Sequence, residues 1–312
     1  MTSSTQTPVT IPDSLRQAEE ALLATAGIPI ERHDAVVGDV RLHYLTCGEG
    51  DPLLLLHGRG GAGALFTSIL PQLAKERRVL TLDLPGWGLS DKPPFTGQRA
   101  RDTLAGWVES VAGFLDSQGL ENIDLLGHSM GGFTALGMAL AHPERISRLI
   151  LVDAGGLGED IQWDMRLYYA LGPEKMHRRL GPRFTRLALR QGVGKHADEL
   201  PPQYYDLAQA LLTQAEVIPS GAAAFNRWIN FSGVHLTLMD RLKELEMPVL
   251  LLWGDSDAIC HYSSALVAAR QLRDGQLVAF THCGHTPFLE RPDDFAHVLL
   301  TWLNGIYVPP RT

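Results

Sequence analysis

The stretch IDLLGHSMGG, at residues 123–132, decides the predicted fold. Its first four residues, apolar except for Asp124, are of the kind that becomes a buried parallel strand, and an apolar helical segment follows at 133–140. Between the two, residues 127–131 match the pattern G-x-S-x-G, in which a serine occupies a sharp turn from strand to helix. Glycine on either side lets the backbone turn this tightly without Cβ clashes. Because a predicted strand precedes the motif and a predicted helix follows it, we predict that Ser129 is a nucleophile at the edge of a sheet.

A serine hydroxyl needs a neighbouring base to act as a nucleophile at neutral pH, and the chain order expected for this motif is serine, acid, histidine. Asp257 follows the apolar run 249–253, and His285 follows the last such run, 277–280. Both lie at carboxyl ends of predicted parallel strands, where open α/β sheets place their sites. We expect His285 to accept the serine proton, and Asp257 to orient and stabilise the imidazolium.

Two other aspartates compete for the acid position. Asp255 lies in the same loop as Asp257, and Asp153 follows the apolar run 149–152. We prefer Asp257, because a turn of a few residues best carries a side chain back over the sheet edge.

Neighbouring side chains also compete with His285 and Ser129. His282 is an alternative base, but Gly284 allows a tighter loop at His285. His128 adjoins the serine, yet its side chain should point away at a sharp turn, so we interpret it as structural. We interpret Cys283 as a small packed residue rather than a nucleophile.

A glycine-rich loop, HGRGG at 57–61, follows the apolar run 53–56. Acyl transfer requires backbone N–H groups that stabilise the developing oxyanion, one from the residue after the nucleophile and one from such an earlier loop. We predict Met130 and Arg59 as these two donors. The loop has neither the Gly-Lys-Ser/Thr ending of a P-loop nor the pattern G-x-G-x-x-G, which argues against nucleotide binding.

Short apolar runs alternate with helical patterns along most of the chain, which indicates a parallel sheet covered on both faces. A hairpin is predicted around residues 38–39, and an N-terminal extension at 1–32 contains a helix from Pro12 to about Gly27. The core is predicted at 33–154 and 246–312. Apolar runs lie at 53–56, 79–82, 123–126, 149–152, 249–253 and 277–280, and helical patterns at about 65–75, 103–118, 130–141, 261–272 and 293–303.

The alternation is interrupted at residues 155–245, which have helical patches, many aromatic residues and no clear strand. An insertion of this length predicts a helical cap or lid. Arg183, Arg186 and Arg190 share one helical face there. They could steer a carboxylate-bearing substrate, but a solvated basic face is the preferred interpretation.

Composition and charge restrict the classes of function. The chain has 312 residues, 45% of them hydrophobic, and a net charge of −8. Nucleic acid is not an expected partner, because its phosphates require a basic patch. No apolar run approaches the roughly 20 residues of a membrane helix, and no secretory signal is visible. Cys47, Cys260 and Cys283 lack metal-site spacing and predict free thiols in a reducing compartment. We expect a cytoplasmic monomer or homodimer with no metal or organic cofactor.

Together these motifs resemble the α/β-hydrolase superfamily over residues 35–304. The resemblance is carried by LLHG at 55–58, DLPGWGLS at 83–90, GHSMGG at 127–132, GDSD at 254–257 and GH at 284–285. It implies an eight-stranded, mostly parallel sheet flanked by helices, an inserted helical cap, and hydrolysis through an acyl-enzyme. The haloalkane dehalogenases and epoxide hydrolases of this fold carry aspartate at the position of Ser129. Carbon–carbon bond hydrolases of ring-fission products are similar in the motifs, but usually have Trp where this chain has Thr286.

The preferred hypothesis is a serine hydrolase that cleaves a small to medium carboxylic ester through a Ser129 acyl-enzyme. A carbon–carbon bond hydrolase of a vinylogous diketone is the alternative enzyme. A non-catalytic binder of a small ligand is the alternative from another class. Candidate pocket residues are His57, Gly58, Trp87, Trp163 and Trp228.

Overall fold

The computed structural model describes residues 11–93, 99–159, 163–213 and 219–306. Within them, eight strands form one sheet in the order β1-β2-β4-β3-β5-β6-β9-β10. The first two strands pair antiparallel with their neighbours, and all later pairs are parallel. The strands are β1 (Glu31–Val37), β2 (Val40–Cys47), β3 (Pro52–Leu56), β4 (Arg78–Leu82), β5 (Ile123–His128), β6 (Ile146–Val152), β9 (Val249–Gly254) and β10 (Gly275–Phe280). The predicted eight-stranded, mostly parallel sheet is confirmed.

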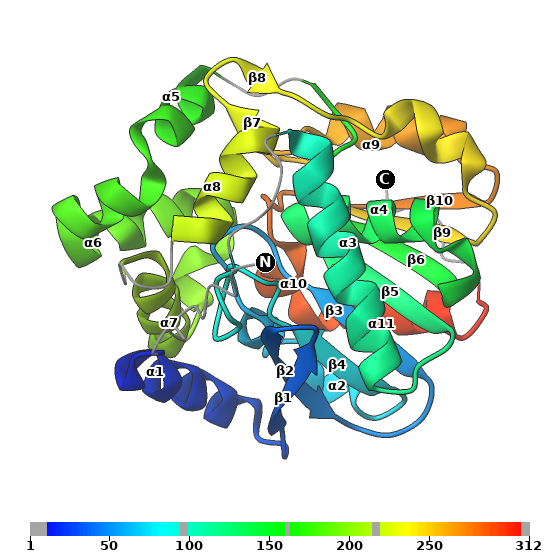
Figure 1. Ribbon diagram of the computed structural model, residues 1–312, viewed down its shortest axis with the longest axis horizontal. Coiled ribbons are helices and arrows are strands. Elements are labelled where there is room, and N and C mark those ends of the chain that lie inside the picture. The colour runs from blue at the N-terminus through cyan, green and yellow to red at the C-terminus, as the bar shows by residue number, and fades with distance from the viewer. Residues whose placement is uncertain (1–10, 94–98, 160–162, 214–218, 307–312) are drawn as a thin grey trace, which may run out of the picture.

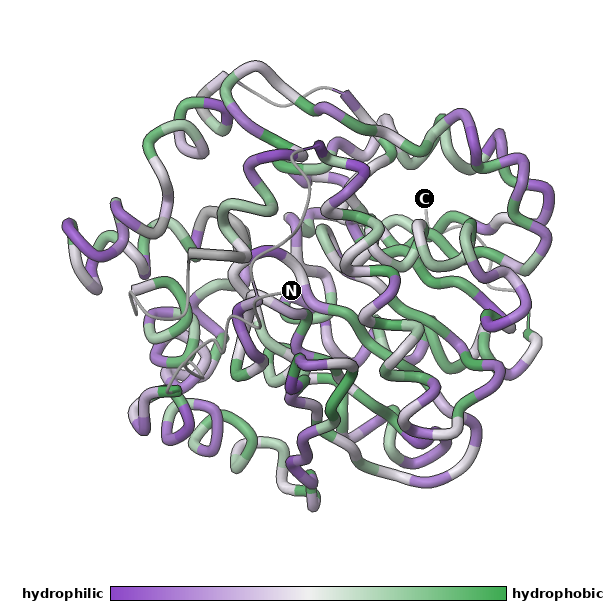
Figure 2. Tube along the Cα trace, in the orientation of Figure 1, coloured by the Kyte–Doolittle hydropathy of each residue, from purple (hydrophilic) through white to green (hydrophobic). Residues whose placement is uncertain are grey.

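Helices cover both faces of this sheet (Figure 1). One apolar core includes residues of α3 (Ala100–Ser117), α4 (Met130–Ala141) and α9 (Tyr262–Gln271). The other includes residues of α2 (Leu70–Leu73), α10 (Pro287–Glu290) and α11 (Pro292–Leu303). The central strands β5 and β9 are buried along their whole length. Figure 2 shows the apolar residues concentrated along these strands. Burial on both faces explains why these strands are mostly apolar rather than alternating, and the buried Asp124 of β5 is paired with Arg148.

A segment with four helices among its described residues lies between β6 and β9, and we call it the insertion. Its helices are α5 (Trp163–Leu171), α6 (Pro173–Val193), α7 (Pro202–Thr213) and α8 (Pro219–Trp228), which lie together on one side of the molecule (Figure 1). Gly181 has a φ of 78° inside α6 and Pro182 follows it, so α6 is two helical pieces joined at a kink. A small hairpin, β7 (Ile229–Asn230) with β8 (Gly233–Val234), follows α8.

The N-terminal helix α1 (Asp13–Leu23) joins the core to this insertion. Its buried face includes Leu15, Leu22 and the carboxylate-bearing Glu19, and it packs against α7 (Figure 1). A 3-10 turn extends it to Gly27, whose φ of 68° ends the helix. Residues 1–10 of the predicted N-terminal extension lie outside the described residues.

Three sequence predictions of local structure were incomplete. The helix predicted at 65–75 is a 3-10 turn and the short helix α2, because Pro71 lacks an N–H and starts a new helix. The helix α10 and the β7–β8 hairpin were missed, since elements of four and two residues are too short to show a period. The 3-10 turns are Ala24–Ala26, Gly63–Phe66, Pro143–Arg145, Gly194–Glu199 and Met239–Glu244. Among the described residues, no helix combines the length and apolar character needed to cross a bilayer.

Candidate active site

Ser129 lies between β5 and α4 in a conformation that non-glycine residues rarely adopt, with φ 52° and ψ −115°. The neighbouring glycines make this turn possible. A Cβ at Gly127 would lie 2.3 Å from the carbonyl oxygen of Gly131, and a Cβ at Gly131 would lie 2.2 Å from that of Leu56. The Ser129 backbone N–H donates to the carbonyl of Val152 at 3.0 Å, which ties the turn to the next strand.

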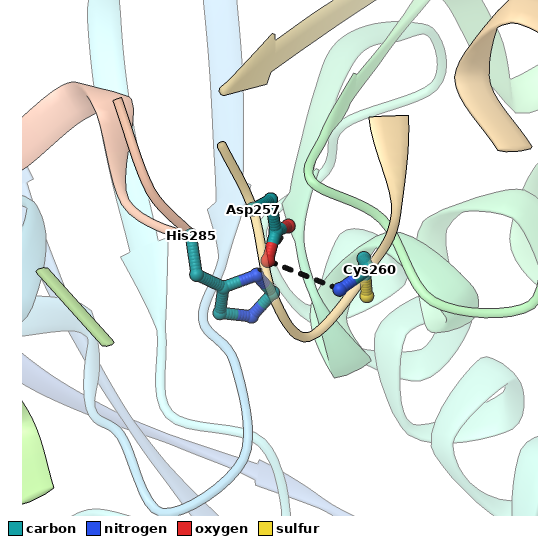
Figure 3. A group of neighbouring side chains, drawn as sticks. All are labelled: Asp257, Cys260 and His285. Atoms are coloured by element: carbon teal, nitrogen blue, oxygen red, sulfur yellow. Dashed lines mark hydrogen bonds and ion pairs between the residues drawn. The ribbon is translucent and has the colours of Figure 1, made fainter. Parts of the chain in front are cut away.

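His285 and Asp257 form a buried hydrogen-bonded pair at the ends of β10 and β9. His285 Nδ1 lies 2.8 Å from Asp257 Oδ2. The other Asp257 oxygen accepts the backbone N–H groups of Ile259 and Cys260, at 2.7 and 3.1 Å. Figure 3 shows the carboxylate between the imidazole and the main chain at Cys260. Because Asp257 occupies Nδ1, the remaining ring nitrogen is Nε2, the one that can exchange a proton with a nucleophile.

The two rival aspartates have other partners. Asp255 Oδ1 accepts the backbone N–H of His282 at 2.8 Å and so fastens two loops together. Asp153 is fully buried, and its Oδ1 accepts the N–H of Gly254 at 2.9 Å. Burial raises the pKa of Asp153 well above its ordinary value, and the neighbouring Asp257 raises it further. A neutral acid at Asp153 cannot supply the negative charge that an imidazolium needs.

The other candidate side chains around the base do not occupy its position. His128 Nε2 donates to the backbone carbonyl of His285 at 2.8 Å, and burial lowers the pKa of His128 well below its ordinary value. A neutral His128 thus supports the loop that carries the base. His282 is exposed, with a φ of 62°. Cys283 is buried, and burial raises its thiol pKa to about 12, which keeps it protonated.

Glu290 is a site residue that sequence reasoning missed. Its carboxylate lies six residues beyond Gly284 and accepts that residue's backbone N–H, at 2.8 and 3.0 Å to its two oxygens. The side chain is 3% exposed, and burial raises its pKa to about 7. The available signal was a carboxylate at the end of the apolar segment 286–289, directly after the predicted base.

The glycine-rich loop packs directly against the serine turn. A Cβ at Gly58 would lie 3.1 Å from the Cβ of Ser129. His57 anchors the loop, since its Nε2 accepts the backbone N–H of Leu84 at 3.0 Å. Met130 is the first residue of α4, so its N–H belongs to the helix N-terminus, where backbone donors have no intrahelical acceptor. Of the two predicted oxyanion donors, Met130 directly follows Ser129, and Arg59 directly follows Gly58, which packs against the Ser129 turn. Their role as donors stays a prediction.

A cavity of about 780 Å³ opens beside Ser129 and His285. Its wall combines the glycine-rich loop, including His57 and Gly58, with apolar and aromatic residues of the helical insertion. A smaller compartment that also contacts Ser129 is lined by Trp228. Tyr169 and Phe225 line both spaces.

Two tryptophans predicted as pocket walls lie elsewhere. Trp163 is 75% exposed at the first turn of α5, so its prediction as a pocket residue was wrong. Its aromatic character did not reveal which face of the helix it occupies. Trp87 is buried next to the cavity wall, with its ring centroid 5.8 Å from the Arg59 guanidinium. Trp87 therefore packs behind the lining residue Arg59 and does not itself line the cavity.

The three arginines of α6 form a surface face. Arg183 is exposed, Arg186 lies 4.6 Å from the Tyr205 ring centroid, and Arg190 pairs with Asp198 at 2.6 Å. The cavity wall, as far as the described residues define it, includes none of the three arginines. This agrees with the preferred interpretation of a solvated face.

Among the residues that the structure describes, two groups of side chains have the spacing of metal ligands. Asp257, Cys260 and His285 present ligand atoms within 4.8 Å of one another. Burial raises the pKa of the Cys260 thiol well above its ordinary value, and metals bind the thiolate. Both oxygens of Asp257 already accept hydrogen bonds. The donor chemistry of this first group therefore favours a hydrogen-bonded pair over a metal.

Glu19, His43 and Asp83 form the second group. The two Asp83 oxygens accept the backbone N–H groups of Gly63 and Leu89, at 2.6 and 2.7 Å. Glu19 and His43 face each other as an ion pair with 3.3 Å between Oε1 and Nε2. We interpret this group as a structural contact that joins α1, β2 and the loop after β4.

Comparison with known proteins gives the family. A family model described as "alpha/beta hydrolase fold" matches residues 51–292, so the chain belongs to this family and is a hydrolase. It is 30% identical over 274 residues to a 2-hydroxymuconate semialdehyde hydrolase of Pseudomonas sp. (strain CF600), covering 85% of this chain and 91% of that protein. It is 27% identical over 297 residues to a 2-hydroxy-6-oxo-6-(2'-aminophenyl)hexa-2,4-dienoic acid hydrolase of Metapseudomonas resinovorans, covering 93% and 96%.

Solved structures share the architecture under several names. The chain superposes on a membrane phospholipase A with a TM-score of 0.76 and 28% identity, covering 94% of this chain and 90% of that one. The carboxylesterase CesB of Bacillus subtilis gives a TM-score of 0.77 at 22% identity, covering 95% and 100%, which shows the shared fold. Relatives by sequence thus include hydrolases of ring-fission products. Neighbours by structure include lipid and ester hydrolases, and also a meta-cleavage product hydrolase of Pseudomonas fluorescens IP01.

Proposed function

We propose that the protein is a serine hydrolase that cleaves a carbon–carbon bond in a vinylogous diketone of the ring-fission type. The observation that carries this proposal is the similarity, over most of both chains, to hydrolases of 2-hydroxymuconate semialdehyde and of a hydroxy-oxo-dienoic acid. The sequence analysis preferred an ester substrate, and these relatives favour its alternative enzyme instead.

In the proposed reaction, Ser129 Oγ attacks the carbonyl carbon and its proton passes to His285 Nε2. Asp257 holds the Nδ1–H side of the ring, at 2.8 Å, and stabilises the imidazolium. The N–H groups of Arg59 and Met130 stabilise the oxyanion. The tetrahedral intermediate collapses by breaking the carbon–carbon bond, and the electron pair goes to the leaving carbon, which takes the proton from His285. Water, activated by His285, then releases the acyl group as a carboxylic acid.

The cavity supports a substrate of this size. About 780 Å³ accommodates a small organic molecule beside Ser129, and most of the wall is apolar or aromatic. We propose that residues 155–245 act as a cap over a core formed by residues 33–154 and 246–312. An enclosed apolar wall excludes water and so strengthens the electrostatic interactions of the site.

Ester hydrolysis is the second candidate function, and one difference from the carbon–carbon bond hydrolases favours it. Thr286 follows His285 where the carbon–carbon bond hydrolases of this resemblance usually have Trp. The similarity to a membrane phospholipase A, at 28% identity, points the same way. The same machinery serves both reactions, since only the leaving atom differs.

The test is a side-by-side assay of two substrate types by the wild type and Ser129→Ala. One substrate is 2-hydroxy-6-oxo-6-phenylhexa-2,4-dienoate, the compound named for a relative in Comamonas testosteroni; the others are p-nitrophenyl esters from acetate to dodecanoate. We expect Ser129-dependent cleavage of the dienoate with higher kcat/KM than any ester. Higher kcat/KM on an ester would transfer the assignment to the second candidate. No turnover of either type, from folded protein, would favour the ligand binder.

A further inference from the structure

The predicted oxyanion loop is intrinsically pliable. Residues 58–61 are glycine except for Arg59, and glycine restricts the backbone least of all residues. Gly60 adopts a φ of 69°, and one backbone hydrogen bond, from Gly61 N–H to the Gly58 carbonyl at 3.1 Å, closes the turn. The position of the Arg59 N–H therefore depends on what holds its side chain.

Three aromatic rings surround the Arg59 guanidinium. Its central carbon lies 4.9 Å from the ring centroid of Phe225, 5.3 Å from that of Tyr169 and 5.8 Å from that of Trp87. Distances below about 6 Å are those of cation–π attraction. Trp87 belongs to the core, whereas Tyr169 lies on α5 and Phe225 on α8. The two insertion rings also contact each other, with centroids 5.3 Å apart. The guanidinium thus joins the glycine-rich loop of the core to two helices of the insertion.

We propose that Tyr169 and Phe225 are positioning residues that, by holding the Arg59 guanidinium, place the Arg59 N–H for the oxyanion. The oxyanion hole is then complete only when α5 and α8 lie against the core. This inference rests on the proposed role of Arg59 as an oxyanion donor.

The geometry makes the rate sensitive to this contact. Gly58 is already packed against the Ser129 turn, so a shift of the loop acts mainly at Arg59. A misplacement of about 1 Å in a catalytic arrangement can cost about 10²-fold in rate. Tyr169 and Phe225 also line both compartments beside Ser129. A substrate in either compartment therefore contacts the two rings that hold Arg59, which couples binding of its apolar part to the position of the proposed donor.

A double-mutant cycle on kcat tests the inference. The variants are Arg59→Met, Phe225→Leu and the double variant, each assayed on the best wild-type substrate. We expect each single variant to lower kcat by about 10- to 100-fold, with KM changed less than about threefold. This is less than the roughly 10²- to 10³-fold loss for removal of an oxyanion donor, because the N–H is displaced rather than removed. The double variant should be no slower than Arg59→Met, because residues that act through one contact are not additive. Arg59→Lys, which keeps a cation, should retain more activity than Arg59→Met. Tyr169→Leu repeats the test if Phe225→Leu fails to fold.

Phe184 provides the matched control. It lines the same cavity from α6, with its ring against His177 at 5.2 Å between centroids. Phe184→Leu should combine additively with Arg59→Met. Affinity for phenylboronic acid, whose tetrahedral serine adduct mimics the oxyanion, should fall in Arg59→Met and Phe225→Leu in proportion to kcat, which a loss of packing alone would not produce.

Additive effects of Arg59→Met and Phe225→Leu, or a change confined to KM, would overturn the inference. Failure of the positioning role can be distinguished from failure of the proposed function. If wild-type turnover requires Ser129 but the cycle is additive, only the positioning role is wrong. If Ser129→Ala retains wild-type turnover, the reaction mechanism itself is wrong.

Discussion

At the scale of single residues, the candidate site depends on a few positions where the packed backbone leaves no room for an additional side-chain atom. Ser129 is held at a φ of 52° by strands and helices on both sides. Such strain typically costs about 1–3 kcal/mol and persists only where the surrounding structure imposes it. The strained turn directs a side chain outward from the sheet edge, beside the cavity that also contacts His285.

Gly131→Ala tests how tightly the turn is packed. The added Cβ would lie 2.2 Å from the Leu56 carbonyl oxygen and 2.6 Å from that of His57, both backbone atoms that cannot move alone. We expect the variant to lose about 1–3 kcal/mol of unfolding free energy, as for overpacking elsewhere, measured by urea denaturation. An unchanged denaturation midpoint would show that the turn is looser than described.

The acid assignment predicts opposite outcomes at two neighbouring aspartates. Asp257→Asn should lower kcat by about 10⁴-fold, because the amide stabilises the wrong tautomer of His285. Asp153→Asn should retain most activity, since burial raises the pKa of Asp153 and already keeps this side chain neutral. Steady-state assays of both variants check this. The reverse order of effects would make Asp153 the acid.

At the scale of elements, α1 is fixed to the core by a buried ion pair. Glu19 is fully buried and faces His43 of β2 at 3.3 Å, while Asp34 of β1 lies 3.2 Å from the other ring nitrogen of His43. Burial by itself lowers the pKa of His43, but Glu19, Asp83 and Asp34 outweigh it and raise the value to about 9. Arg32 is a further charge near Glu19, whose own pKa burial raises. The same helix packs on α7, so this pair helps to hold the insertion in place.

This ion pair predicts a pH dependence of stability. In the unfolded chain His43 loses its proton near its ordinary pKa of 6.5, whereas the folded protein keeps it until about pH 9. The stabilisation is therefore complete below pH 6.5 and is lost as pH rises through 9, amounting to about 2–3 kcal/mol. Urea denaturation of wild type and His43→Gln from pH 6 to 9.5 measures it. The difference between the two proteins should shrink toward pH 9.5, and a constant difference would contradict the prediction.

The elements themselves show which features a sequence pattern reveals. Strand β9 was recognisable because burial on both faces leaves a continuous apolar run, and β5 because its run is interrupted only by Asp124 before the serine motif. The kink at Gly181 and the orientation of Trp163 depend on tertiary packing of α5 and α6, which periodicity does not encode. Glu290 was missed for a related reason, since a buried carboxylate is meaningful only with its partner Gly284 in view.

At the scale of the whole molecule, the sheet gathers distant segments of the chain at one edge. Ser129, Asp257 and His285 follow three different strands, β5, β9 and β10, and the parallel order of these strands brings their carboxyl ends together. Chain order and strand ends restricted the acid to Asp153, Asp255 and Asp257, and the short turn before Asp257 favoured it; this assignment stays a prediction. Substrate choice could not be predicted this way, because the cavity wall comes from an insertion whose helices pack in ways the motifs do not specify.

Covalent labelling of Ser129 is the most direct test of the central claim. Wild type and Ser129→Ala are treated with a fluorophosphonate, and the adduct is located by peptide mass spectrometry while turnover is followed on the best substrate. We expect one adduct on Ser129, loss of turnover in step with labelling, and neither labelling nor turnover in folded Ser129→Ala. Turnover that survives in folded Ser129→Ala, or an inactivating adduct on another residue, would contradict it.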